Sequence, residues 1–251
     1  MLYRPLFWTS YWCEDWIFET DYRGANCVLI SSASSKTAFC LAYLIGKRFA
    51  RGDIRRKTIV GLTSKQNVAF TTSLGLYDEV VDYDSISTAP SLQLSEDKKW
   101  IYADVAGNGA LNKRVFAHFR SNEHLVASIA LGMTNLSPST PDKVSKVWGL
   151  NTFATAAKSP SSTSPAPLEQ FFMVEWLNVR KHHLAPQEIH ALQEKAWKEL
   201  MKDCVGWVKL DRVSGVEAVK KAYEHLTKGG LGPDKGFIWN LWGDDDVRPK
   251  L

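Results

Sequence analysis

Two patterns of hydrophobic positions alternate along the first half of the chain. Short uninterrupted apolar runs are typical of strands buried on both faces, whereas apolar residues at every third or fourth position indicate amphipathic helices. The first pattern predicts strands over 26–31, 57–62, 79–83, 99–105 and 125–131. The second predicts helices over 1–22, 37–51 and 67–74 and one that includes 115–119. This alternation predicts an α/β fold of the Rossmann type, with a doubly wound, mainly parallel sheet and helices on both faces.

The second half of the chain is organised differently. Residues 135–167 are rich in serine, threonine and proline, which predicts a loop or a lid over a site. Apolar spacing returns over 186–202 and 216–227, which predicts two helices, and 236–242 reads as a terminal strand. We therefore expect an aromatic N-terminal helix (1–22), a Rossmann core (23–134), a loop or lid (135–183) and C-terminal helices and a strand that complete the domain (184–251).

The predicted N-terminal helix carries an unusual number of aromatic residues. They recur at helical spacing in two adjacent stripes: Phe7, Tyr11 and Phe18, and Trp8, Trp12 and Trp16. Both stripes can belong to the core. Alternatively, one stripe faces a second copy of the chain, because so much aromatic area is hard to cover in 251 residues. The second interpretation predicts a homo-oligomer.

Composition narrows the class of protein. An apolar fraction of 45% and a charged fraction of 23% are typical of a soluble globular chain. The sequence shows neither a membrane-length apolar run nor a signal peptide, so we expect a cytoplasmic protein without a transmembrane segment. A net charge of +4 without aromatic residues interleaved among the basic ones argues against nucleic-acid binding. The four cysteines are too far apart for a metal or redox motif, so no metal is expected.

The segment 28–38 carries the most informative local pattern. A buried strand leads through small residues into a helix, and the backbone N–H groups of such a turn can hold a phosphate. Ser35, Lys36 and Thr37 resemble the end of a nucleotide-triphosphate loop, but Ile30 and Ser35 occupy its two glycine positions, which argues against that class. The turn also lacks the glycines of a dinucleotide site, and serine adopts positive φ less readily than glycine.

The end of the second predicted strand favours one dinucleotide over another. An acidic residue there would bind the ribose 2′-hydroxyl, whereas its absence beside a cation admits a 2′-phosphate. The sequence places Thr63, Ser64 and Lys65 at this point and no acid. NADPH is therefore favoured over NADH, unless Lys65 is simply solvated.

Several further motifs follow in a recognisable order. Ser73-Leu74-Gly75 precedes the third strand, Val80-Val81-Asp82-Tyr83 forms it, and Asp104-Val105-Ala106-Gly107 follows the fourth. With the serine-rich turn, this order resembles the cofactor domain of the medium-chain dehydrogenase/reductase superfamily, on its zinc-free quinone oxidoreductase/enoyl reductase side. Members of that superfamily carry a GroES-like catalytic domain before the cofactor domain. The resemblance begins at about the helix that connects the two domains, so we expect a form without that catalytic domain.

The resemblance implies a set of cofactor contacts. It assigns the pyrophosphate to Ser32, Ala33, Ser34, Ser35 and Lys36, the 2′-phosphate to Thr63, Ser64, Lys65 and Asn67, the adenine ribose to Tyr83, and the nicotinamide side to Ala106, Gly107, Ala130, Leu131 and Gly132. The implied activity is NADPH-dependent reduction of an activated C=C or C=O bond in a small organic substrate.

Catalytic residues leave a weaker signal. Candidate proton donors are Tyr102 and Lys181, followed by His182 and His183, although neighbouring residues on a helix do not share a face. The glycine-free turn and the missing catalytic domain leave a second hypothesis open. In it the chain is a homodimeric, degenerate Rossmann protein that has lost the cofactor. It then binds a small molecule for lyase, isomerase or hydrolase chemistry, or acts as a subunit of another enzyme.

Overall fold

The structure is a computed structural model that describes residues 3–105, 107–120, 123–131, 166, 168–227 and 232–242. Within these ranges the chain forms two compact units, which divide between His183 and Leu184.

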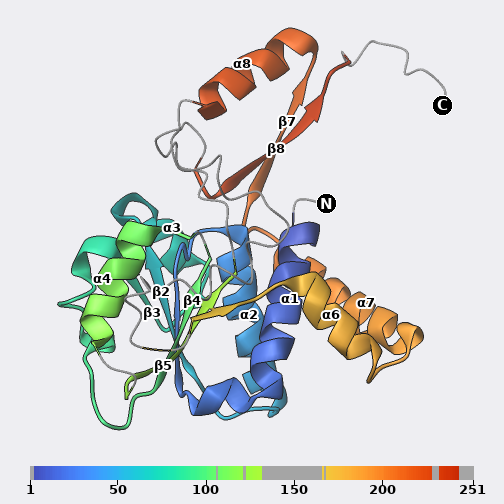
Figure 1. The fold of residues 1–251 in the computed structure, drawn as a ribbon. Coiled ribbons are helices and arrows are strands. Elements are labelled where there is room, and N and C mark those ends of the chain that lie inside the picture. Colours follow the sequence, from blue (N-terminus) through green and yellow to red (C-terminus); the bar gives the residue numbers. More distant parts are fainter. Residues whose placement is uncertain are drawn as a thin grey trace, which may run out of the picture. The chain divides into compact units, whose positions relative to one another are not determined.

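The first unit contains a six-stranded parallel sheet (Figure 1). Its strands are β1 (Cys27–Ile30), β2 (Thr58–Thr63), β3 (Glu79–Asp82), β4 (Trp100–Asp104), β5 (Leu125–Ala130) and β6 (Leu168–Gln170). The spatial order is β3-β2-β1-β4-β5-β6, and all neighbouring strands are parallel. The strand order reverses between β1 and β4, which is the topology of a Rossmann fold. The predicted fold class is confirmed.

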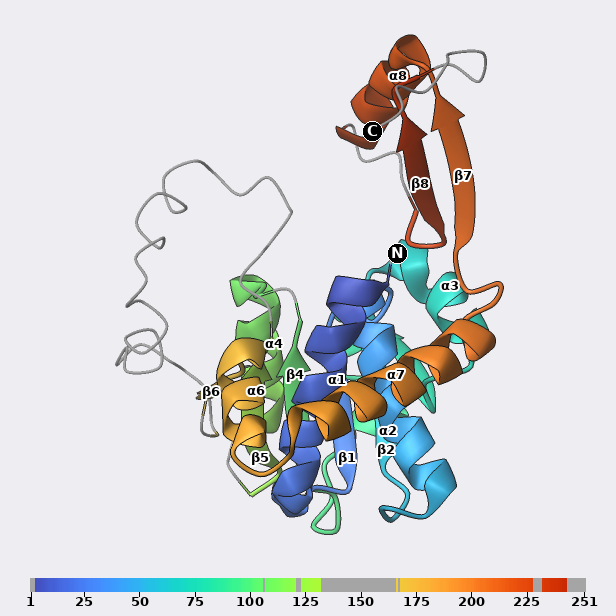
Figure 2. The same ribbon diagram turned by 90° about the vertical axis from the view of Figure 1, so that its right-hand side faces the viewer.

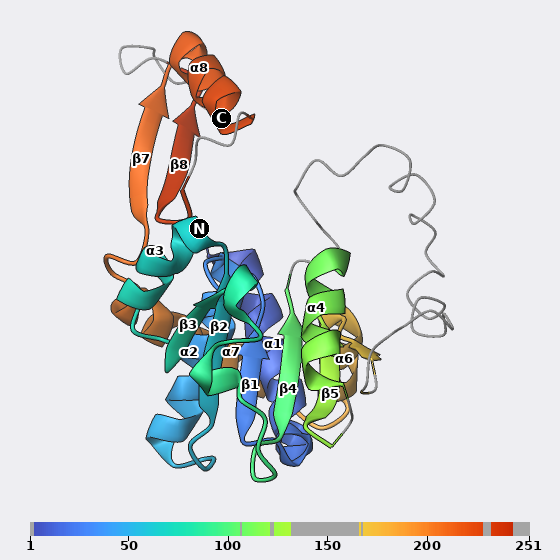
Figure 3. The ribbon, with the colours of Figure 1, turned by 90° about the vertical axis from the view of Figure 1, so that its left-hand side faces the viewer.

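Helices cover both faces of this sheet (Figures 1 and 3). They are α1 (Arg4–Glu19), α2 (Lys36–Arg51), α3 (Val68–Ser73), α4 (Gly109–Phe119) and α6 (Met173–Lys181). Helix α1 packs along α2 and against α6 on one face, and α4 lies on the other. Each crossover returns the chain to the same end of the sheet, so every strand points the same way.

Both faces of the central strands are apolar, as the sequence pattern predicts. On β1 the alternate residues Cys27 and Leu29 pack into a core with Val115 and Phe119 of α4. The intervening Val28 is equally buried, on the opposite side of the strand. A strand covered on both faces needs apolar residues at every position, which explains its uninterrupted hydrophobic run.

A buried ion pair ties α1 to α2. Glu14 is 3% exposed, and both of its carboxylate oxygens accept hydrogen bonds from Arg48 Nε at 2.8 Å. The Tyr22 hydroxyl donates to the same carboxylate at 2.5 Å. Burial raises the pKa of Glu14, and the Arg48 and Tyr22 donors oppose that rise by favouring the charged form. This contact fixes the helix layer that supports β1.

The aromatic stripes of α1 have partners inside the first unit. The Trp16 ring packs against Phe171 with centroids 5.5 Å apart, and the Phe18 ring lies 3.7 Å from the Arg48 guanidinium carbon. Asp15 accepts from Trp176 Nε1 at 2.8 Å and so connects α1 to α6. These contacts agree with the core interpretation of the stripes, and a homo-oligomer stays a prediction.

The second unit contains α7 (Pro186–Asp203), β7 (Lys209–Ser214), α8 (Val216–Thr227) and β8 (Lys235–Asn240), which Figure 2 shows in a side view. Strand β8 pairs in parallel with β7 as a separate two-stranded sheet. The terminal strand was expected to complete the main domain, and here the structure differs from that expectation. The Tyr223 and Trp239 rings, 6.0 Å apart, connect α8 to this sheet.

Among the strands and α-helices of the described residues, β6, α6 and β7 have no counterpart in the sequence predictions. Strand β6 has only three residues and follows the serine-rich segment, so it is too short to give a recognisable hydrophobic pattern. Residues 132–165 and 167, most of the predicted loop or lid, lie outside the described residues, whereas 168–181 contain regular structure. No helix in the described ranges combines the length and the hydropathy needed to span a membrane.

Candidate functional site

The carboxyl ends of the parallel strands meet at one edge of the sheet, which is where ligands bind in folds of this topology. Two hydrogen bonds hold the strand ends together there. Ser31 N donates to Ala103 O at 2.9 Å, and Leu131 N donates to Asp104 O at 2.8 Å. The carboxyl ends of β1 and β4, where the strand order reverses, are therefore the candidate site.

The turn from β1 into α2 contains a residue in the left-handed region and a capped helix start. Ser32 has φ = +51°, in the left-handed region that favours glycine. Ser35 caps the helix, and its hydroxyl accepts from Ala38 N at 3.3 Å. Phe39 N donates to Ser35 O at 3.0 Å, so Ser35 closes the first turn of α2 with both its hydroxyl and its carbonyl. The helix start also carries the positive end of the helix dipole, which favours an anion beside it. Serine thus takes a conformation that glycine ordinarily supplies.

Close packing against β2 fixes this turn. Ala33 N donates to Leu62 O at 2.8 Å, and the Tyr77 hydroxyl donates to Ala33 O at 2.9 Å. A Cβ atom added at Gly61 would stand 2.8 Å from the Ala33 Cβ and 2.9 Å from the Tyr77 ring. Gly61 is therefore required, because the turn approaches the backbone of β2 too closely for any side chain.

A small cluster of polar side chains joins the turn to the end of β2. The Ser34 hydroxyl lies 3.2 Å from both Thr63 Oγ1 and Asn67 Nδ2. Thr63 is fully buried, so it supports the turn and does not face solvent, whereas Lys65 is exposed. Of the residues predicted to meet a 2′-phosphate, the structure brings Thr63 and Asn67 onto Ser34 and leaves Lys65 accessible.

A buried carboxylate, Asp104, organises the β4 side of the candidate site. Asp104 Oδ1 accepts from Ser31 Oγ at 3.2 Å and from Gly107 N at 3.0 Å, and Oδ2 accepts from Asn112 Nδ2 at 2.6 Å. Ser31 Oγ in turn accepts from Val105 N at 2.9 Å. The network joins the ends of β1 and β4 to the start of α4. The sequence analysis does not select Ser31 or Asn112, although an aspartate at the end of a buried strand was an available signal.

The two predicted proton donors, Tyr102 and Lys181, do not join the hydrogen-bonded groups at the ends of β1 and β4 as free donors. Tyr102 is fully buried, and its hydroxyl donates to Asn112 Oδ1 at 2.7 Å. Burial and the nearby Asp104 raise the pKa of Tyr102 well above its usual value, so it does not release a proton near neutral pH. Lys181 is exposed at the end of α6, next to Arg180, which pairs with Glu19 near the amino edge of the sheet. Tyr102 is therefore a support for Asn112, and Lys181 lies at the opposite edge.

The remaining predicted residues lie at strand ends. Gly107 follows β4 with φ = +67°, and Ala130 and Leu131 are half-buried at the end of β5. Tyr83 directly follows β3 and packs against the hydrophobic core. Ala106 and Gly132 lie outside the described residues.

The described residues contain no group of three histidine, cysteine or acidic side chains that could hold a metal ion. Cys13, Cys27 and Cys40 are buried, and burial raises the pKa of the Cys13 and Cys27 thiols. Low thiolate content makes Cys13 and Cys27 unreactive packing residues.

Comparison with known proteins gives one family match and several similar folds. The family model described as "Protein of unknown function (DUF2855)" matches residues 1–232. No curated protein matches the sequence. Similar solved structures include the yhdH oxidoreductase from Salmonella enterica in complex with NADP. Its sequence is 15% identical and its TM-score is 0.46, and the match covers 93% of this chain and 61% of that chain. CurA from Vibrio vulnificus in complex with NADPH has 12% identity, a TM-score of 0.46 and the same two coverages. This chain therefore spans about three fifths of the length of these structures.

Proposed function

The chain belongs to this DUF2855 family of proteins of unknown function, and we propose that it binds NADPH and reduces an activated C=C or C=O bond in a small organic substrate. The observation that carries the proposal is the left-handed turn at Ser32, which opens α2 at the strand-order reversal of a Rossmann sheet.

The geometry of the turn suits a pyrophosphate. The N-terminus of α2 offers the positive end of the helix dipole. The close fit of Ala33 onto Gly61 draws the turn against β2. Small side chains at Ser32, Ala33 and Ser34 leave room for a phosphate to approach the backbone.

The end of β2 suits a 2′-phosphate better than a free ribose. The segment 58–67 contains no acidic residue that could accept a hydrogen bond from a 2′-hydroxyl. Lys65 is exposed and directly follows Ser64, so its ammonium group can reach a phosphate at this edge. The proposed preference for NADPH rests on these two features.

In this proposal the protein binds and positions, and the nicotinamide, when bound, supplies the hydride. Asp104 and its donors fix the loop after β4 relative to the turn after β1. Asn112 holds that carboxylate from the first turn of α4, supported by Tyr102. These hydrogen bonds limit the relative motion of the two segments that would hold the reactants, the turn after β1 and the loop after β4.

One observation favours a second candidate function. Ser34, Thr63 and Asn67 already satisfy one another within the predicted phosphate site. A site that has lost its dinucleotide would keep such internal bonds. In that case the chain is a degenerate Rossmann protein that binds another small molecule for non-redox chemistry, or a subunit of another enzyme, as a homodimer.

Replacing Lys65 tests the proposal. Lys65→Ala removes a charge-assisted contact to the 2′-phosphate and should weaken NADPH binding by about tenfold, with little effect on NADH. Gln66→Ala, an exposed neighbour, is the matched control and should change neither affinity. Equal losses for NADPH and NADH in Lys65→Ala would contradict the assignment, as would a similar loss in Gln66→Ala.

A further inference from the structure

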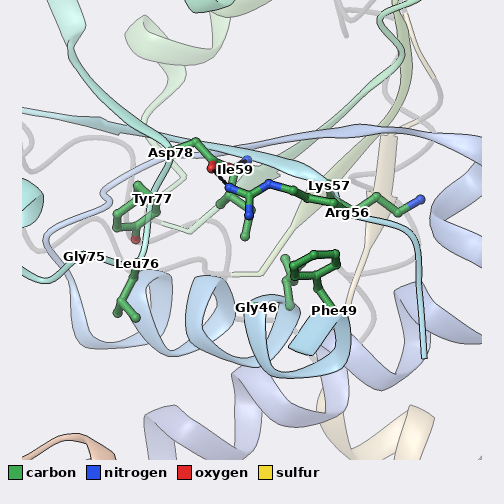
Figure 4. Close-up of a pocket in the computed structure, with 10 residues that line it drawn as sticks. Gly46, Phe49, Arg56, Lys57, Ile59, Gly75, Leu76, Tyr77 and Asp78 are labelled. Atoms are coloured by element: carbon green, nitrogen blue, oxygen red, sulfur yellow. Dashed lines mark hydrogen bonds and ion pairs between the residues drawn. The ribbon is translucent and has the colours of Figure 1, made fainter. Parts of the chain in front are cut away.

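A cavity next to β2 has no part in the proposed function. It lies between the second half of α2, the start of β2 and the connection that leads into β3, and its volume is about 240 Å³ (Figure 4). Because β2 runs from Thr58 to Thr63, its first residues lie at the amino edge of the sheet, opposite the end of the strand that faces the Ser32 turn. The cavity is therefore separate from the candidate cofactor site.

Much of the cavity lining is apolar. Ile45 and Phe49 contribute from α2, and Leu76 contributes from the connection before β3. The Phe49 ring is 40% exposed, which is high for a large hydrophobic side chain beside a concave surface. Such a surface favours a ligand with an apolar or aromatic body.

Two cationic side chains, Arg56 and Lys57, line the cavity, and Arg56 lies against its apolar wall. The Arg56 guanidinium carbon lies 5.4 Å from the centre of the Phe49 ring, and Arg56 pairs with Asp78 (Figure 4). Asp78 Oδ2 also accepts from Ile59 N at 2.8 Å, so both carboxylate oxygens have donors. A guanidinium carries five N–H donors, and one carboxylate oxygen leaves several of them for an incoming anion.

A glycine inside α2 keeps the cavity open. Gly46 lies in the interior of the helix, where glycine costs about 1 kcal/mol relative to alanine. A Cβ atom placed on Gly46 would meet nothing within 4 Å, so packing does not require the glycine. Gly46 lines the cavity, and a side chain longer than that of alanine can extend from this position into the space beside Phe49. Gly46 therefore lowers the stability of α2 at a position where a longer side chain would narrow the cavity.

We propose that this cavity binds a small carboxylate with an aryl or branched alkyl body. The apolar body would pack on Phe49 and Leu76, and the carboxylate would accept hydrogen bonds from Arg56. Tyr77 also lines the cavity, and its hydroxyl holds Ala33 O in the turn. A ligand in the cavity therefore contacts the side chain that supports the candidate cofactor site.

Calorimetric titration of the full chain tests this site with three probes: benzoate, phenylacetate and isovalerate. Benzylamine at the same ionic strength is the cationic control. At least one carboxylate should bind saturably, and benzylamine should not. Arg56→Gln should weaken that binding by about fivefold, because the guanidinium is partly exposed and its contact is partly screened.

Two leucine variants of α2 locate the binding. Gly46→Leu should abolish carboxylate binding by filling the space, and it should fold well because leucine favours a helix more than glycine does. Ala50→Leu, exposed on the same helix and outside the lining, should bind like the unmodified chain. The proposal is overturned if none of the three carboxylates binds saturably, if benzylamine binds equally well, or if Gly46→Leu leaves binding unchanged.

Discussion

Ser32 occupies a backbone conformation that costs a residue with a side chain about 1–2 kcal/mol, because the Cβ atom crowds the following carbonyl. Replacing it with glycine removes this cost and adds back about 0.5–1 kcal/mol of chain entropy in the unfolded state. Ser32→Ala removes the same hydroxyl but keeps the Cβ atom. We therefore expect Ser32→Gly to be more stable than Ser32→Ala by about 0.5–1 kcal/mol.

Urea unfolding followed by tryptophan fluorescence measures this difference, because Trp12 and Trp100 are buried in the first unit and report its unfolding. The midpoint should rise from Ser32→Ala to Ser32→Gly with no change in the slope of the transition. Ser35→Gly is the matched control: it removes the cap of α2 at φ = −78° and should lower stability by a few tenths of a kcal/mol. If Ser32→Gly is less stable than Ser32→Ala, the turn does not have the left-handed backbone on which the candidate site depends.

Three further predictions concern the supports of the site. Arg48→Met leaves the Glu14 carboxylate buried without its cation and should lower the free energy of unfolding, measured in urea, by about 3–5 kcal/mol. The double variant Glu14→Gln with Arg48→Met should lose less, because it leaves no buried charge. An equal loss in the two variants would contradict the ion pair. Burial and Asp15 raise the pKa of Tyr11 to about 12, so the folded chain holds this proton more tightly than the unfolded chain. Stability should therefore fall as the pH rises from about 10 to about 12, and less steeply in Tyr11→Phe, as urea unfolding at several pH values can show. Asn112→Leu removes a hydrogen-bond donor from the buried Asp104 carboxylate and should lower the free energy of unfolding by about 1–3 kcal/mol in the same assay. An unchanged urea midpoint would contradict the hydrogen-bond network around Asp104.

The sequence predicts the sheet well because its strands are buried on both faces. An uninterrupted apolar run such as Val28, Leu29 and Ile30 has apolar side chains on both faces of the strand, so both faces have to be buried. Runs of this kind indicate central strands of a parallel sheet. Strand β7 was missed because Lys209–Ser214 mixes charged and apolar residues, with no continuous apolar run. The sequence does predict its partner β8, but the hydrophobic pattern of a strand does not indicate which other strand it pairs with.

The site is less visible in the sequence than the fold. The small residues after β1 correctly indicate a strand–turn–helix junction, but the positive φ of Ser32 contradicts the ordinary preference of serine. Tyr102 was selected for its chemistry, whereas its burial depends on α4, which follows it in the chain. Asn112 reaches Asp104 only because the first turn of α4 folds back over the end of β4. Contacts of this kind depend on tertiary structure and leave no periodic signal.

The most direct test of the account is a titration of the unmodified chain with NADPH and with NADH, following the quenching of its ten tryptophans. Proposed binding at the Ser32 turn predicts saturable quenching by NADPH at lower concentration than by NADH. Absence of saturable quenching by either dinucleotide up to millimolar concentration would contradict the proposed function and favour the degenerate, cofactor-free alternative.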